Sequence, residues 1–298
     1  MERHKTNRFG NEKKRARDGR VSASKWGHYD ADLAAQLQMD ADTLPAPVTS
    51  TYEISKTPIR PPELDWRRLH RIPMGYNASS PEHAQSLIAG NDERVLQVID
   101  DLRTQLLQTL QIESWKRIAI TAPTSGCGAT FTAVQLALSI SRIPDFRTVL
   151  IDLNQRSPHV ARTLGLRRPG DVHAFLSGYI DPEDYLVRCS ETLALGLNDA
   201  KPIGPSEILH SRHAAEALGE MINTLNPDVI LYDLPPMLEY DDLAAFLPQV
   251  DGVLLVVDAS KTLATQIEEC ERRLSGKTSL LGVILNRSRS TSGTALAA

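Results

Sequence analysis

The sequence predicts an α/β protein with a doubly wound, mostly parallel β-sheet, preceded by a disordered N-terminal arm. From Lys116 onward, short apolar runs alternate with helical patterns. These runs are apolar at nearly every position, which indicates strands buried on both faces, as in a parallel sheet covered by helices. A glycine-rich stretch separates the first such strand from the helix after it, and ligands of doubly wound folds bind at that kind of turn.

Each element is predicted from its local pattern. The first helix is expected within 79–111, where Leu96, Ile99, Leu102 and Leu106 recur at steps of three and four residues and so share one face. Asn226-Pro227 ends a later helix, because proline restricts the residue before it and lacks an N–H. The predicted strands are 117–122, 148–153, 228–234, 251–259 and 280–286, and the predicted further helices are 130–143, 158–166, 213–225 and 265–274.

Three regions are predicted: an arm over 1–80, one α/β domain over 81–290 and a flexible tail over 291–298. The arm is polar and repeatedly interrupted by proline, which is typical of disorder. Its first 25 residues are rich in Lys and Arg. This charge is interpreted either as a contact with anionic lipid or nucleic acid, or as a solvated tail. The solvated tail is favoured, since no aromatic or amphipathic pattern accompanies the charge.

Composition excludes several classes of protein. The net charge of -4 over 298 residues gives no general case for nucleic-acid binding, so no specific nucleic acid is expected as a partner. The three cysteines are widely separated, which argues against a disulfide framework or a zinc site. The longest apolar run is too short to span a bilayer. We expect a cytoplasmic protein that a partner recruits to the inner face of the plasma membrane.

The candidate site lies at three strand ends. The stretch "APTSGCGATF" over 122–131 follows the first strand, and its Gly126 and Gly128 permit close approach of a phosphate to the backbone. Thr130 stands where a P-loop hydroxyl meets Mg²⁺. Asp152 and Asp233 each end an apolar strand, and carboxylates beside such a loop are the minimum for Mg²⁺–phosphate chemistry. Taken alone, the glycine stretch is equally compatible with a tight turn.

The segment from about Arg94 to Arg289 resembles the bacterial tyrosine kinases (BY-kinases) of capsule and exopolysaccharide systems, which belong to the MinD/ParA-like P-loop NTPases. "APTSGCGATFTA" resembles the family's phosphate loop, "VLIDLNQRSP" its Walker A′ strand and "VILYDLPPML" its Walker B strand. "KPIGPSEILHS" and the last two strands also match in order. The resemblance implies a P-loop fold that binds ATP or ADP with Mg²⁺.

Residue roles follow from the resemblance. Asp152 would be the acid near the accepting hydroxyl, and Asp233 the Walker B acid that holds magnesium through water. These two are the candidate catalytic residues, and with Thr130 they are the candidate Mg²⁺ ligands. Asn286 would lie near the adenine. The candidate nucleotide-binding residues are Gly126, Cys127, Gly128, Ala129, Thr130, Phe131 and Asn286.

The sequence departs from the family at four places. Ala129 replaces the lysine that pairs with the β- and γ-phosphates, and Asn154 replaces the second acid of the D-x-D motif. The E-x-x-R-x-x-R assembly motif retains only Arg103, with Gln97 and Asp100 at the other positions. The family's C-terminal tyrosine cluster is absent from the tail over 291–298.

Loss of the lysine predicts weak nucleotide binding and weak or lost kinase activity, because phosphoryl transfer depends on positioning and charge neutralisation. The expected function is that of a degenerate BY-kinase-like regulatory or docking partner of a membrane polysaccharide co-polymerase (chain-length determinant protein), with homo-oligomers possible. Two alternatives stay open. One is an active ATP-dependent autokinase or ATPase that uses a substitute cation such as Arg156 or a neighbouring subunit's residue. The weaker one is a MinD/ParA-like localisation switch.

Overall fold

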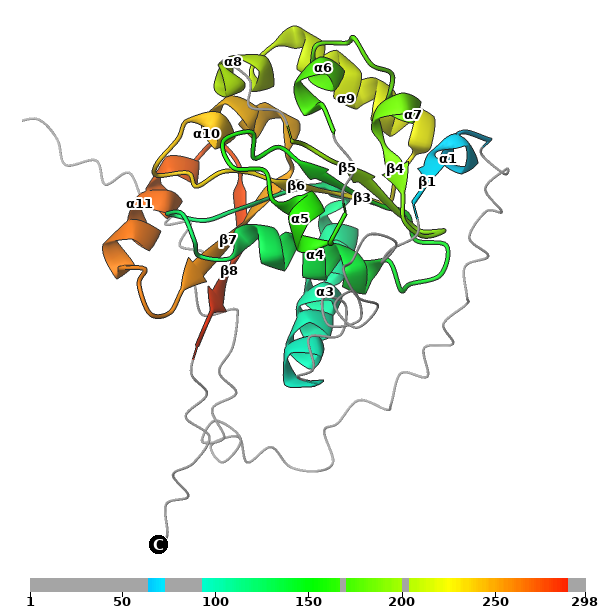
Figure 1. Ribbon diagram of the computed structural model, residues 1–298. Coiled ribbons are helices and arrows are strands. Elements are labelled where there is room, and N and C mark those ends of the chain that lie inside the picture. Colours follow the sequence, from blue (N-terminus) through cyan, green and yellow to red (C-terminus); the bar gives the residue numbers. More distant parts are fainter. Residues whose placement is uncertain (1–63, 73–92, 167–169, 200–203, 289–298) are drawn as a thin grey trace, which may run out of the picture. The chain divides into compact units, whose positions relative to one another are not determined.

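A computed structural model describes residues 64–72, 93–166, 170–199 and 204–288 (Figure 1). They form an eight-stranded sheet with the strand order β1-β4-β5-β3-β6-β2-β7-β8. Every neighbouring pair is parallel except β4 and β5. The predicted fold class is therefore confirmed for the α/β domain. The strands are β1 His70–Arg71, β2 Arg117–Thr121, β3 Thr148–Asp152, β4 Val187–Arg188, β5 Leu193–Gly196, β6 Val229–Asp233, β7 Gly252–Asp258 and β8 Ser279–Asn286.

Helices cover both faces of the sheet (Figure 1). Successive residues of the central strands point to opposite faces. Thus Ile118 packs in the core that includes residues of α3, α4 and α5, and Ala119 packs in the core that includes residues of α1, α6, α9 and α11. The helices are α1 Leu64–Arg68, α3 Glu93–Glu113, α4 Ala129–Ile140, α5 Val160–Thr163, α6 Val172–Leu176, α7 Pro182–Tyr185, α8 Pro205–Leu209, α9 Arg212–Leu225, α10 Asp242–Phe246, the 3₁₀ helix η3 Leu247–Gln249 and α11 Ala264–Leu274.

The predicted boundary of the N-terminal arm at residue 80 is wrong for residues 64–72. These residues form α1 and β1, and β1 pairs in parallel with β4. Trp66 and Leu69 are each only 2% exposed in the core, and the Trp66 indole Nε1 donates a hydrogen bond to the Glu191 carbonyl at 2.9 Å. Burial of a tryptophan and a leucine offsets the loss of chain entropy in this short segment. The rest of the predicted arm and the tail over 291–298 lie outside the described residues.

The segment between β3 and α9 contains short elements to which no sequence pattern was assigned. They are α6, α7, β4, β5 and α8, each two to five residues long. Elements of this length carry too few residues for a periodic signal. Phe175 and Tyr185 hold this region together by stacking at a centroid distance of 4.4 Å. Of the first predicted helix, residues 93–111 are confirmed and 79–92 lie outside the described residues. The other predicted elements are confirmed within a few residues at their ends.

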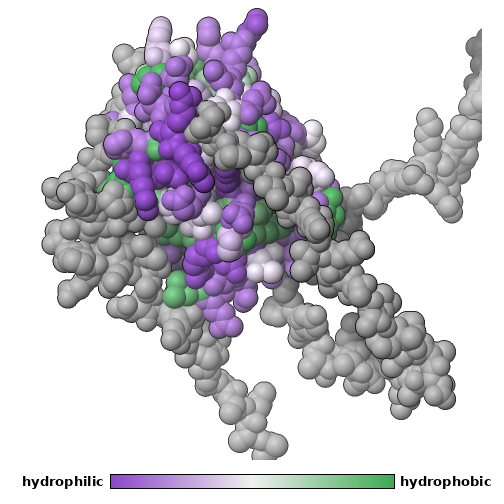
Figure 2. All heavy atoms as spheres, turned by 90° about the vertical axis from the view of Figure 1, so that its right-hand side faces the viewer, coloured by the Kyte–Doolittle hydropathy of each residue, from purple (hydrophilic) through white to green (hydrophobic). Residues whose placement is uncertain are grey.

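The side of the molecule on the right in Figure 1 is shown in Figure 2. Hydrophilic residues make up most of the described surface in that view, and hydrophobic residues form a narrow band among them. Within the described part of the chain, no helix has both the length and the apolar character that a membrane crossing requires.

Asp251, in the turn before β7, links the start of β2 to the start of β7. Its carboxylate accepts hydrogen bonds from the backbone N–H groups of Lys116 and Arg117 at 2.9 and 2.8 Å. It also forms an ion pair with the Arg117 guanidinium at 2.6 Å. Burial by itself would raise the pKa of Asp251, but the bonds from Arg117 and the backbone outweigh burial and lower this pKa.

Replacing Asp251 with asparagine is expected to lower the free energy of unfolding by about 1–3 kcal/mol at neutral pH, because a charged acceptor of several hydrogen bonds is lost. A lowered native pKa means that the carboxylate stabilises the fold above its unfolded pKa and loses this effect as the pH falls through the native pKa. The difference from wild type should therefore shrink in acid. Urea unfolding at several pH values measures it, and an undiminished difference in acid would contradict this account.

Candidate functional site

The glycine-rich stretch forms the turn between β2 and α4. Gly126 and Gly128 have φ angles of +82° and +98°, in the left-handed region that side chains disfavour. Asn286, at the end of β8, donates a hydrogen bond from Nδ2 to the Cys127 carbonyl at 2.8 Å. Left-handed residues in a turn before a helix direct successive backbone N–H groups towards a common point, which makes an anion-binding concavity. The turn, residues 122–130, is called the phosphate loop below.

The two predicted aspartates lie side by side at the carboxyl ends of β3 and β6. Asp152 is paired in register with Asp233, and both are fully buried. The Thr130 hydroxyl donates to Asp233 Oδ2 at 2.7 Å, which joins the phosphate loop to the second aspartate. Three residues that are far apart in the sequence are therefore brought together, as predicted for adjacent parallel strands.

Hydrogen bonding differs between the two aspartates. Asp152 accepts bonds from the backbone N–H groups of Asn154, His159 and Val160 at 3.0–3.1 Å. Asp233 Oδ1, by contrast, is buried and has no hydrogen-bond partner in the part of the chain that the structure describes. A buried carboxylate oxygen without a partner is costly unless a ligand completes its environment.

The pKa values of both aspartates are raised. Burial raises the pKa of Asp152 to about 7, against the opposing effect of its three backbone hydrogen bonds. Burial, followed by the charge of Asp152, raises the pKa of Asp233 well above its usual value. Two adjacent buried carboxylates disfavour each other's ionisation. A cation placed between them and the loop would relieve this cost.

These donors fit Mg²⁺. Thr130, Asp152 and Asp233 supply oxygen ligands, which Mg²⁺ prefers, and the unpartnered Asp233 Oδ1 is an oxygen that a cation or its water would satisfy. When bound, Mg²⁺ would neutralise phosphate charge at the end of the phosphate loop. The chain's own part is to hold the hydroxyl and the carboxylates at one place on the sheet edge.

The remaining predicted nucleotide-binding residues lie on or beside the loop. Cys127 is buried, and its Sγ lies 3.7 Å from the hydroxyls of Thr124 and Thr262. Ala129 begins α4 and is half-buried, whereas Phe131 is 44% exposed. Asn286 contacts the loop backbone through its amide. Its implied place near the adenine stays a prediction.

Arg156, the candidate substitute cation, has carboxylate partners in the structure. Its Nη2 lies 3.0 Å from Asp242 Oδ2, whose side chain is completely buried, and 3.9 Å from Asp241 Oδ1. The guanidinium also lies over the Tyr240 ring, 4.7 Å from its centroid. Releasing Arg156 towards a phosphate would leave the buried Asp242 uncompensated, which is strongly unfavourable.

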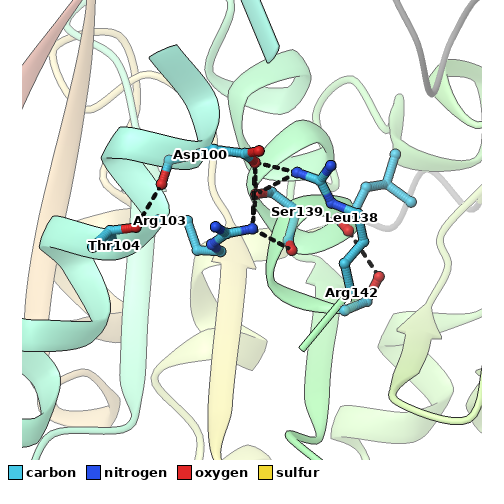
Figure 3. Close-up of polar contacts among 7 residues, drawn as sticks. Asp100, Arg103, Thr104, Leu138, Ser139 and Arg142 are labelled. Atoms are coloured by element: carbon cyan, nitrogen blue, oxygen red, sulfur yellow. Dashed lines mark hydrogen bonds and ion pairs between the residues drawn. The ribbon is translucent and has the colours of Figure 1, made fainter. Parts of the chain in front are cut away.

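The altered assembly motif forms a polar cluster between α3 and α4 (Figure 3). The Arg103 guanidinium donates to Asp100 Oδ1 at 3.3 Å and to the Ser139 hydroxyl at 3.2 Å. Arg142 is paired with the same Asp100 carboxylate, which also accepts a 2.6 Å bond from the Ser139 hydroxyl. Asp100, at the position of the motif's first arginine, therefore holds Arg103 against α4.

Ser125 forms hydrogen bonds with Glu239, a contact that the sequence does not predict. Glu239, in the loop after β6, accepts hydrogen bonds from the Ser125 backbone N–H at 2.6 Å and from its hydroxyl at 2.5 Å. These residues are 114 positions apart, and Glu239 belongs to none of the recognised motifs. No sequence signal indicates this contact.

A cavity of about 410 Å³ lies beside the phosphate loop rather than within it. It runs between the segment after β6 and α11, and Glu239 lies in its wall. Tyr240, Arg273 and Lys277 also line it. The predicted phosphate- and metal-binding residues are not part of its lining, and the geometry of the loop is a better guide to the nucleotide site than cavity size.

Comparison with known proteins identifies relatives. No family model matches the chain. The tyrosine-protein kinase CpsD of Streptococcus agalactiae is 27% identical over 177 residues, which cover 58% of this chain and 75% of that protein. The chromosome-partitioning ATPase Soj of Thermus thermophilus is 29% identical over 57% of this chain and 68% of its own. The kinase domain of the Escherichia coli tyrosine kinase ETK superposes with a TM-score of 0.63 at 22% identity, covering 72% of this chain and 84% of that chain.

The fold and the site resemble those of P-loop proteins of the MinD/ParA-like group, because a glycine-rich loop lies beside two aspartates at adjacent strand ends. In sequence the chain is related to the bacterial tyrosine-protein kinases, as its motifs predict. Further tyrosine-protein kinases, from Salmonella typhi and Bacillus subtilis, match it at 28% identity.

Proposed function

We propose that this protein is a BY-kinase-like component of exopolysaccharide or capsule synthesis, with weak or no kinase activity, that acts by docking on a membrane co-polymerase. The observation that carries the proposal is Ala129, an alanine at the lysine position of a phosphate loop that otherwise keeps its shape. Gly126 and Gly128 have left-handed conformations, and the Thr130 hydroxyl is hydrogen-bonded to Asp233. The cation that neutralises the β- and γ-phosphates is the part that is missing.

The ion pair of Arg156 supports weak activity. A substitute cation would have to lie near the phosphate loop, and the Arg156 guanidinium is instead bound by the buried Asp242. Removing a preorganised electrostatic donor commonly slows a reaction by about a hundred- to a thousandfold. Nucleotide then acts, at most, as a ligand that stabilises one conformation.

The alternative function is that of an active ATP-dependent autokinase or ATPase. It is favoured by the joint retention of Thr130, Asp152 and Asp233, since Mg²⁺ held there would still neutralise part of the phosphate charge. The cation would then come from another subunit in a homo-oligomer.

Activity measurements separate the two functions. With Mg²⁺ and labelled ATP, the wild-type chain is expected to form no more phosphotyrosine or ADP than a variant carrying both Asp152→Ala and Asp233→Ala. Ala129→Lys is expected to raise ATP affinity by about tenfold or more, because a cation is returned to the loop. Circular dichroism of each variant verifies folding. Wild-type activity that disappears in the double variant would refute the proposal of a degenerate kinase.

Docking is tested with membranes. The protein is expected to sediment with vesicles that contain the polysaccharide co-polymerase and to remain in the supernatant with vesicles that lack it. Sedimentation with both preparations would indicate direct lipid binding, and sedimentation with neither would contradict the proposed partner.

A further inference from the structure

The loop after β6 is hydrogen-bonded along the start of the phosphate loop. The backbone N–H of Met237 donates to the Ala122 carbonyl at 2.9 Å, and that of Leu238 donates to the Pro123 carbonyl at 3.1 Å. Two consecutive residues of one loop are thus aligned with two consecutive residues of the other. This alignment brings the next side chain of the β6 loop close to Ser125.

Glu239 is that side chain. One carboxylate oxygen accepts the Ser125 backbone N–H at 2.6 Å, and the other accepts the Ser125 hydroxyl at 2.5 Å. Both oxygens of the carboxylate are therefore used by a single residue of the phosphate loop. The contact lies next to the backbone bonds of Met237 and Leu238, which argues against a chance approach of two surface side chains.

The Glu239 carboxylate in this contact is negatively charged, as a nucleotide is, and therefore repels it. Ser125 immediately precedes Gly126, the first left-handed residue of the loop, so its donors lie at the edge of the anion-binding concavity. Carboxylates and phosphates compete for such donors. The loop therefore lacks a lysine at position 129 and has a glutamate bound to it. Both features make the surroundings of the loop more negative.

This negative charge weakens the binding of a nucleoside triphosphate more than that of a diphosphate. The triphosphate carries an additional charged group, and repulsion between like charges grows with the charge of each partner. In P-loop proteins the lysine contacts the β- and γ-phosphates. Its absence therefore weakens the binding of the γ-phosphate, which only the triphosphate has. Ser125 and Glu239 are both exposed, which leaves the contact free to open when a ligand approaches.

We infer that Glu239 is a specificity-determining residue of the nucleotide site: its carboxylate competes with the terminal phosphate for the Ser125 donors, so that the site favours a nucleoside diphosphate over a triphosphate. This inference rests on the proposed function, in which the phosphate loop still binds nucleotide. It extends that function, because it gives the loop a preferred ligand.

Titration calorimetry with Mg·ADP and with a non-hydrolysable Mg·ATP analogue tests the inference. Wild type is expected to bind ADP about tenfold more tightly than the analogue. Glu239→Gln keeps the size of the side chain and one acceptor oxygen but removes its charge. It should improve affinity for the analogue about tenfold, and for ADP by about threefold or less. Glu268→Gln, at an exposed glutamate of α11, removes the same charge elsewhere and should change neither affinity.

The outcomes distinguish this inference from the proposed function. If Ala129→Lys binds nucleotide but Glu239→Gln affects both ligands equally or not at all, the inference is wrong and the nucleotide site stands. If wild type, Glu239→Gln and Ala129→Lys all fail to bind either ligand, both the inference and the nucleotide site are rejected. Ser125→Ala provides a second variant: by removing one donor it should loosen Glu239, and an unchanged ratio of the two affinities would also count against the inference.

Discussion

Replacing Gly128 with alanine is expected to lower the free energy of unfolding by about 2–3 kcal/mol and to abolish nucleotide binding. A Cβ at this position would lie 2.2 Å from Asn286 Nδ2, and the backbone φ of +98° is unfavourable for any residue with a side chain. The Asn286 amide must then move, which breaks its 2.8 Å hydrogen bond to the Cys127 carbonyl. Strain and the lost bond act together at the centre of the loop.

Gly126 provides the matched control. Its φ is +82°, but a Cβ there would meet nothing within 4 Å in the described structure. Gly126→Ala should therefore cost only the backbone strain, about 1 kcal/mol. Thermal and urea unfolding of both variants measure the difference.

A double-mutant cycle with Asn286→Ala isolates the clash. In that background the Gly128→Ala cost should fall towards the Gly126→Ala cost, since the obstructing amide has been removed. Equal costs for Gly128→Ala in the two backgrounds would show that Asn286 does not restrict the loop.

Replacing Asp233 with asparagine is expected to stabilise the metal-free protein by about 1–2 kcal/mol near pH 8. The substitution keeps an oxygen that can accept the Thr130 hydroxyl and removes a buried charge next to Asp152. The variant is more stable because the wild-type fold buries two adjacent carboxylates, which is unfavourable without a metal ion.

The pH dependence of this effect follows from the raised pKa of Asp233. Between the unfolded and the higher native pKa, the native state binds more protons than the unfolded state, so wild-type stability falls as the pH rises. The advantage of Asp233→Asn should therefore be small near pH 5 and grow towards about pH 8. Asp251→Asn gives the opposite behaviour, since the pKa of Asp251 is lowered.

Magnesium supplies the complementary measurement. Thermal unfolding in a chelating buffer and then with Mg²⁺ should show a rise in Tm for wild type and little or no rise for Asp233→Asn, because ligand binding stabilises only the state that binds it. A variant that is less stable than wild type near pH 8 without metal would contradict the cost assigned to the buried pair.

Much of the site was predictable because its parts are local. Asp152 and Asp233 each end a run of apolar residues, and such runs can be buried only between two helical layers. The turn after β2 is predicted from Gly126 and Gly128, since few other residues adopt positive φ. Parallel strands align their carboxyl ends, so the meeting of these residues follows from the fold class.

Other features depend on contacts between distant segments. Residues 64–72 lie in a segment that reads as a polar arm. They are part of the domain because Trp66 is buried in the core and β1 pairs with β4. The short elements between β3 and α9 likewise owe their conformations to packing rather than to periodicity.

The sequence by itself determined the α/β class, the phosphate loop with its missing lysine and the two carboxylates, because each is a local pattern of residue types. Only the tertiary structure decided that Arg156 is bound by Asp242 and that Glu239 is bound by Ser125. These partners are 86 and 114 residues apart, and no local pattern encodes which charged side chains meet across such distances. The physical reason is that ion pairs and hydrogen bonds act at contact range, and contact between distant residues exists only once the chain has folded.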